Sequence, residues 1–123
     1  MTQTQQLIDI ATRNVSCLLS DATIGEAAAI MAKHHFSSIV ITDHSRHPLG
    51  IVTERNILEA MRAGHPVGTP LRSCMSAPVT MVPGTMNCLD AYQTCLREGI
   101  RHLVLAGDDG KVAGCRYRRH GAD

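Results

Sequence analysis

The chain has 123 residues, of which 44% are hydrophobic and 19% are charged, and its formal net charge at pH 7 is +1. This composition is typical of a globular domain and excludes wholesale disorder. Three aromatic residues provide no stacking platform for single-stranded nucleic acid, and the basic cluster near the C-terminus is too small for duplex binding. No apolar run approaches the roughly 18 residues of a membrane span, and the N-terminus lacks the pattern of a secretory signal. We therefore expect a cytoplasmic protein that has no membrane span and does not bind nucleic acid.

The elements predicted for the first half alternate as strand, helix, strand, strand and helix, at residues 15–19, 24–35, 36–42, 49–53 and 54–63. Thr23 and Glu26 have the capping-box spacing at the start of the first helix. The two strands that follow are rich in β-branched residues and flank a polar turn. Thr53 can cap the second helix, which Gly64 ends. The first half therefore predicts a β-α-β-β-α unit.

The second half repeats this order after a linker that contains Pro66, Gly68 and Pro70. Its predicted elements are a helical turn at 71–75, a strand at 79–82, a helix at 86–98, a strand at 101–106, a tight turn at 107–110 and a strand from 111. The final helix of the unit is missing, which indicates an incomplete second copy. Apolar residues between positions 3 and 12 predict a lead-in helix, which we expect to cover an open sheet edge.

The two halves of the chain form an internal sequence repeat. Val15 to Arg55 aligns without a gap on Val79 to Arg119, at an offset of 64 residues, and identical valine, alanine and glycine residues recur. A repeat of this kind indicates a duplicated supersecondary unit whose copies bury their apolar faces against each other. Units of roughly 60 residues bury too little surface to be stable alone, so we expect one body.

Catalytic and metal-binding patterns are not evident. Five cysteines form no C-x-x-C pair, so we expect buried reduced thiols and neither a disulfide framework nor a zinc site. His34-His35 and His44-x-x-His47 have the composition of metal ligands, but the first two point to different sides of a helix and the others lie in a turn. No nucleophile-elbow, zinc-protease or P-loop motif occurs. We therefore predict no catalytic residues and no metal; a thiol-based enzyme or sensor stays open as an alternative.

The doubled unit resembles the cystathionine β-synthase (CBS) domain, and the pair resembles the tandem Bateman module. The likeness rests on Ala27-x-x-x-Met31, on the strand Ile39-Val-Ile-Thr-Asp43 and on the signature Gly50-Ile-Val-Thr-Glu-Arg-Asn56. It implies an α+β fold of two β-α-β-β-α repeats packed about a pseudo-two-fold axis, the second truncated at its C-terminus. We assign residues 1–66 to a lead-in helix and first repeat, 67–78 to the linker and 79–123 to the second repeat.

The resemblance implies a cleft for an adenosine-containing ligand. The signature places Thr53 at a strand-to-helix junction, where a helix N-terminus favours phosphate, and sets Asn56 toward the ribose hydroxyls. The family has aspartate where this chain has Asn56, so the charge-assisted contact is lost. The ligand-binding residues implied by the resemblance are Ser16 and Cys17 through their backbone groups, Ser37, Ser38, Ile39, Ile51, Thr53, Arg55, Asn56, Arg101 and His102.

Each of these assignments has a purely structural alternative. Thr53 caps a helix whether or not a ligand binds, Ile39 and Ile51 suit a core, and Arg101 and His102 suit a surface. In the second repeat the threonine and aspartate of the signature become Tyr117 and His120, so the second cleft is expected to be degraded.

The resulting expectation is a regulatory module without enzymatic activity. It binds AMP, ADP, ATP or S-adenosylmethionine in a cleft between the repeats, needs no cofactor, forms a homodimer and signals to an attached domain or partner. The alternative is a structural dimerisation module with vacant clefts.

Overall fold

The computed structural model describes residues 5–10, 15–100, 102–113 and 115–117. The first repeat consists of β1 (Val15–Leu19), α2 (Ile24–His34), β2 (Ser38–Thr42), β3 (Pro48–Thr53) and α3 (Glu54–Arg62). The second consists of β4 (Met81–Pro83), α4 (Cys88–Glu98), β5 (Val104–Ala106) and β6 (Cys115–Tyr117). The short helix α1 (Leu7–Ile10) precedes the first repeat, and a 3₁₀ turn, η1 (Leu71–Ser73), lies in the linker. The expected order of elements is confirmed, with strands of the second repeat shorter than expected.

Local capping chemistry sets the helix ends. Thr23 accepts a hydrogen bond from the backbone N–H of Glu26 at 3.2 Å, and Glu26 accepts in return from the backbone N–H of Thr23 at 3.3 Å. This is the expected capping box, and it satisfies amides that have no partner within the helix. Helix α4 ends at Gly99, which adopts the left-handed conformation that glycine accepts without steric cost.

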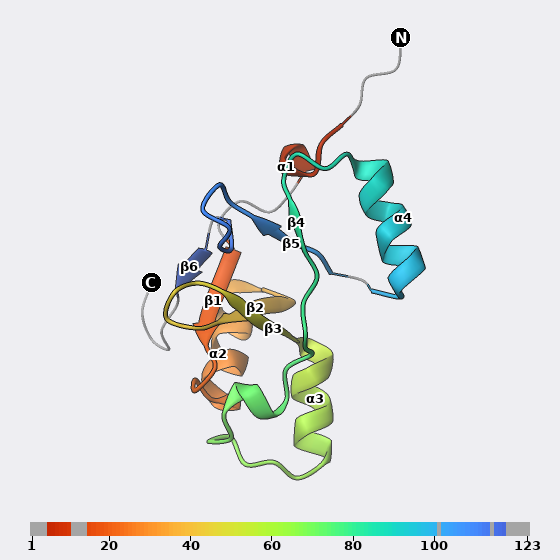
Figure 1. The fold of residues 1–123 in the computed structure, drawn as a ribbon. Helices are drawn as coiled ribbons and strands as arrows, with labels where there is room; N and C mark the ends of the chain where they lie inside the picture. The colour runs from red at the N-terminus through yellow and green to blue at the C-terminus, as the bar shows by residue number, and fades with distance from the viewer. Residues whose placement is uncertain (1–4, 11–14, 101, 114, 118–123) are drawn as a thin grey trace.

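The strands form a four-stranded sheet in the order β3-β2-β1-β6 and a two-stranded sheet of β4 and β5 (Figure 1). The last strand was expected from residue 111, after the tight turn that follows β5, but β6 begins at Cys115. Val112 makes only an isolated bridge to Ala106, and β6 then pairs in parallel with β1 of the first repeat. An unpaired strand edge leaves backbone groups unsatisfied, and β6 covers that edge of β1.

Helix α1 was expected at an open sheet edge, but its backbone bonds join it to the second repeat. The N–H groups of Leu7 and Ile8 donate to the carbonyl oxygens of Met86 and Gly84, both at 2.9 Å. Cys88, at the start of α4, donates to the carbonyl oxygen of Gln5 at 2.8 Å. The segment before the first repeat thus packs on the second, while the end of the second repeat pairs with the first.

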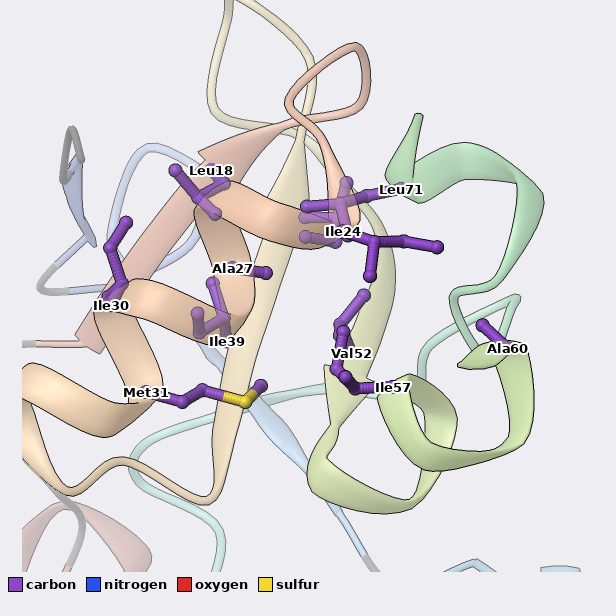
Figure 2. Close-up of a cluster of buried hydrophobic side chains, with 11 residues drawn as sticks. Leu18, Ile24, Ala27, Ile30, Met31, Ile39, Val52, Ile57, Ala60 and Leu71 are labelled. Carbon is purple, nitrogen blue, oxygen red and sulfur yellow. The ribbon is translucent and has the colours of Figure 1, made fainter. Parts of the chain in front are cut away.

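The main core lies between the four-stranded sheet and helices α2 and α3, as Figure 2 shows. Its buried members are Leu18, Ile24, Ala27, Ile30, Met31, Ile39, Ile41, Val52, Ile57, Ala60 and Leu71. A second cluster fills the space between the repeats and consists of Cys17, Val40, Ile51, Val104 and Val112. Because successive side chains of a strand point to opposite faces, one sheet serves both cores. The expectation that the copies bury apolar faces against each other is confirmed.

Polar contacts between two turns add to this inter-repeat packing. Arg46, in the β2–β3 turn, forms an ion pair with Asp109 of the second repeat, and the backbone N–H of Val112 donates to the carbonyl oxygen of Arg46 at 3.2 Å. The backbone N–H of Lys111, and then the Arg46 guanidinium, lower the pKa of Asp109 below its usual value. A depressed carboxylate pKa stabilises the fold above the unfolded-state value of about 3.9, and this contribution disappears as the pH falls through the folded-state pKa.

Three of the cysteines are the reduced thiols that the sequence predicted, and one is not. Cys74, Cys88 and Cys95 are free, and burial raises the pKa of the Cys74 thiol, which disfavours its reactive thiolate. Cys17, however, is disulfide-bonded. A missing C-x-x-C motif excludes only a pair close in sequence, because a disulfide between distant residues leaves no spacing pattern.

No helix among the described residues is long and apolar enough to cross a membrane. The cytoplasmic location stays a prediction.

Candidate functional site

The strand-to-helix junction between β3 and α3 is built around Thr53 and Asn56. Thr53 is the N-cap of α3, and its hydroxyl oxygen accepts a hydrogen bond from the backbone N–H of Asn56 at 3.2 Å. Asn56 Oδ1 accepts in return from the Thr53 backbone N–H at 2.8 Å and from the Thr53 hydroxyl at 3.0 Å. The capping role of Thr53 is confirmed. The same bonds hold both side chains of the expected ribose and phosphate subsite in one place.

The linker supplies a third polar side chain to this junction. Asn56 Nδ2 donates to Ser76 Oγ at 3.1 Å, although the two residues lie 20 positions apart. Ser76 is fixed by two backbone bonds with Ile51, of 2.9 and 2.8 Å, so the linker runs beside the end of β3 (Figure 1). Sequence reasoning missed Ser76 because no spacing connects it to Thr53.

Gly50 explains how the linker comes so close. A Cβ at this position would lie 2.7 Å from Met75 Sδ and 2.8 Å from the carbonyl oxygen of Ser76. Side-chain atoms do not approach that closely, so only glycine accommodates the linker against β3. The glycine of the signature is therefore required by packing at the edge of the site.

The two serines before and at the start of β2 meet the same junction. The backbone N–H of Glu54, the first residue of α3, donates to the carbonyl oxygen of Ser37 at 3.2 Å. Ser38 pairs directly with Thr53 in the antiparallel ladder. Ser37, Ser38, Thr53, Asn56 and Ser76 thus gather where β2 begins and β3 ends.

The period of two along a strand divides the remaining predicted residues between the faces of the sheet. Ile51 and Cys17 belong to the inter-repeat cluster, on the face that the alternation also assigns to Ser38 and Thr53. Ile39 belongs to the core on the helix-covered face, as one of the structural alternatives proposed. The structure therefore brings Ile51, but not Ile39, to the face of Thr53.

Ser16 is buried, and its Oγ has no hydrogen-bond partner among the described residues. Its neighbour Leu18 on the same face packs in the helix-covered core, which places Ser16 there as well. Strand β1 lies between β2 and β6, with Cys17 in register with Val40 and Tyr117. Both edges of β1 therefore face a neighbouring strand. The backbone groups of Ser16 and Cys17, which we expected to bind a ligand, lie where the hydrogen bonds of the sheet form.

The charged candidates lie further from this junction. The Arg55 side chain is 76% exposed, with its Nε 3.8 Å from Glu59 Oε1 one turn later. His102 is exposed and lies just before β5, where the second repeat matches Ser38 of the first. Arg101 lies outside the described residues, as do the side chain of Tyr117 and all of His120, on which the expected degradation of the second cleft depended.

The histidines have other roles in the described structure. His34 stacks on Phe36, with ring centroids 5.2 Å apart, and His35 ends α2 in the left-handed conformation. His47 Nδ1 lies 3.2 Å from Asp43 Oδ2 in the β2–β3 turn. Within the described ranges, no three His, Cys, Asp or Glu side chains gather as a metal site.

Two successive α+β units that share an apolar interface define a tandem repeat. The CBS domain profile matches residues 7–63 and 71–115. The chain therefore belongs to the CBS domain family, and its two repeats form a Bateman module.

Comparison with individual proteins gives the same family. The chain is 33% identical to an uncharacterized 17.7 kDa protein of Acidianus ambivalens over 85% of its own length and 63% of that protein's. It is 32% identical to an uncharacterized protein of Methanopyrus kandleri, over 86% of this chain and 55% of that protein. It thus spans between 55% and 63% of the length of these two relatives. A CBS domain protein of Pyrobaculum aerophilum, solved in complex with AMP, superposes with a TM-score of 0.77 at 28% identity, covering 87% of this chain and 82% of that one.

Proposed function

We propose that this CBS pair is a regulatory module that binds an adenosine-containing ligand, AMP, ADP, ATP or S-adenosylmethionine, at the junction of β3, α3 and the linker. Binding is signalled to an attached domain or a partner protein, and the module itself catalyses no reaction. The observation that carries the proposal is the convergence of Thr53, Asn56 and Ser76 on one strand-to-helix junction.

The chemistry of the junction supports this class of ligand. Hydroxyl and amide groups suit ribose hydroxyls, and the N-terminus of α3 attracts a phosphate. Ile51, on the same face of the sheet, offers an apolar surface to a purine where stacking aromatic residues are scarce. The related protein from Pyrobaculum aerophilum binds AMP, which makes AMP the first ligand to test.

Thermal melting with AMP, ADP, ATP, S-adenosylmethionine and NAD tests the proposal. At least one of the adenosine ligands is expected to raise the midpoint, since a ligand at about 100 times its dissociation constant stabilises the fold by roughly 2.7 kcal/mol. Thr53→Ala is expected to abolish that shift. Thr23→Ala is the matched control because it removes the equivalent cap of α2, at a cost of about 0.5–2 kcal/mol, and should retain the shift. A wild-type protein without any shift at millimolar ligand contradicts the proposal; a shift that survives in Thr53→Ala contradicts the site.

A second candidate function, dimerisation, is favoured by an apolar stripe on α4. Leu89, Tyr92 and Leu96 follow the three- and four-residue spacing of one helix face, and their exposed fractions are 64%, 62% and 64%. Side chains of this size are seldom grouped on an unpartnered face. We propose that this stripe contacts a second copy of the chain in a homodimer, which would also be the whole function if the ligand site is vacant.

Sedimentation of the Tyr92→Asp variant tests the dimer. A carboxylate in the middle of an apolar contact is costly to bury, so we expect the wild type to sediment as a dimer and the variant as a monomer with unchanged secondary structure. Leu58→Asp, at a position of α3 that is exposed to the same extent (62%), introduces the same charge outside the stripe and should remain dimeric. Equal sedimentation of the two variants would rule out the stripe as the interface.

A further inference from the structure

Asn56 poses a chemical problem for ribose binding. A carboxylate presents two acceptor oxygens, whereas an amide presents one acceptor and one donor. The two neighbouring hydroxyls of a ribose both donate, so they are well matched by a pair of acceptor oxygens. Asn56 alone supplies one, and that oxygen already accepts from the backbone N–H of Thr53 at 2.8 Å.

Ser76 places a second oxygen beside it. Ser76 Oγ accepts from Asn56 Nδ2 at 3.1 Å and lies 3.5 Å from Asn56 Oδ1. A hydroxyl oxygen has two lone pairs, so one remains for a further donor. The Ser76 side chain belongs to an exposed residue, which leaves it open to a ligand. Two acceptor oxygens from residues distant in sequence thus lie side by side.

The position of Ser76 is held by its backbone rather than by its hydroxyl. Both backbone bonds to Ile51 are short, and the linker lies against Gly50, where a side chain would not fit. Removal of the hydroxyl therefore leaves the linker in place. The amide nitrogen of Asn56 donates to Ser76, which fixes the amide with its oxygen on the Thr53 side.

We propose that Ser76 determines specificity for a ligand with a vicinal diol, its Oγ acting together with Asn56 Oδ1 in place of the two oxygens of an aspartate. The inference rests on the proposed function of the module. A diol bound here takes the place of the Thr53 hydroxyl at Asn56 Oδ1, which frees that hydroxyl to donate to a phosphate oxygen. The preferred ligands are therefore adenosine compounds with both the 2′- and the 3′-hydroxyl intact.

Calorimetric titration with AMP, 2′-deoxy-AMP and 3′-deoxy-AMP tests this role. For the wild type we expect AMP to bind about two- to tenfold more tightly than at least one deoxy analogue, the effect of one neutral hydrogen bond. In Ser76→Ala we expect the affinity for AMP to fall by a similar factor, and the preference for AMP over that analogue to disappear. Asn56→Asp combined with Ser76→Ala restores the second oxygen and should restore the preference.

Three controls separate this role from a structural one. Ser73→Ala, in η1 of the same linker, should bind all three ligands as the wild type does. Ser76→Thr keeps a hydroxyl and should keep the preference, and melting without ligand should show Ser76→Ala as stable as Ser73→Ala. If Ser76→Ala binds AMP with wild-type affinity and preference, Ser76 has no such role although the proposed function stands. If the wild type binds no adenosine ligand, the proposed function fails, and this inference fails with it.

Discussion

Leu71→Ala is expected to lower the free energy of unfolding by about 2–5 kcal/mol, the range measured for leucine truncation in well-packed cores. Leu71 has 0% exposure and belongs to the main core although it lies in the linker. Its backbone N–H donates to the carbonyl oxygen of Ala22 at 2.8 Å, and Ile24 donates to the carbonyl oxygen of Thr69 at 2.9 Å. These bonds fix the linker against the start of α2, so the cavity left by truncation cannot close easily.

Denaturation in urea measures this effect, with Leu58→Ala as the matched control. Leu58 lies on α3 and is 62% exposed, so the same truncation there should change the free energy of unfolding by no more than about 0.5 kcal/mol. An unchanged urea slope would show that the difference lies in native stability and not in the surface exposed on unfolding. Equal losses in the two variants would mean that the linker is not part of the core.

Gly50→Ala is the second change with a large expected effect, because the added methyl group has no space. Its Cβ would lie 2.7 Å from Met75 Sδ and 2.8 Å from the Ser76 carbonyl oxygen, and the second of these is a backbone atom. Overpacking of this kind costs about 1–3 kcal/mol. The linker must also move away from Ile51, which carries Ser76 away from Asn56. We therefore expect a lower unfolding midpoint together with loss of any adenosine-ligand shift.

Gly68→Ala provides the comparison for Gly50→Ala within the same linker region. A Cβ at Gly68 meets no atom within 4 Å, and the residue is not in the left-handed conformation. Because alanine leaves the unfolded chain fewer conformations than glycine does, Gly68→Ala should leave the free energy of unfolding unchanged or raise it by up to about 1 kcal/mol. Thermal and chemical melting of the two variants in parallel is sufficient, and a Gly50→Ala protein as stable as Gly68→Ala would contradict the close approach of the linker.

The features predicted from the sequence are those encoded locally. Thr23 and Glu26 lie three residues apart, and that spacing alone determines a capping box. Thr53 before an amphipathic stretch likewise predicted the start of α3. The repeat predicted two copies with a shared apolar interface because its apolar positions recur at a constant offset.

The features that escaped prediction depend on contacts between distant segments. Ser76 meets Asn56 only after the linker has folded back along β3, and no residue pattern records that path. The pairing of β6 with β1, in place of β5, also depends on which strand edge is open in the assembled molecule. Ile39 and Ile51 differ by their sheet face, which the sequence left undecided because both are apolar residues in predicted strands.

The crossed attachment of the terminal segments affects how the chain acquires its structure. Val15 pairs with Cys115, and Gln6 pairs with Asn87, so each repeat is completed by a segment from the other side of the linker. Such pairings close very long loops, and the entropy of loop closure is lost before they form. A half-synthesised chain therefore exposes the edge of β1 until the second repeat arrives. We therefore expect the two copies to fold as one cooperative unit, because each needs a segment from the other side of the linker to complete its sheet or its helix packing.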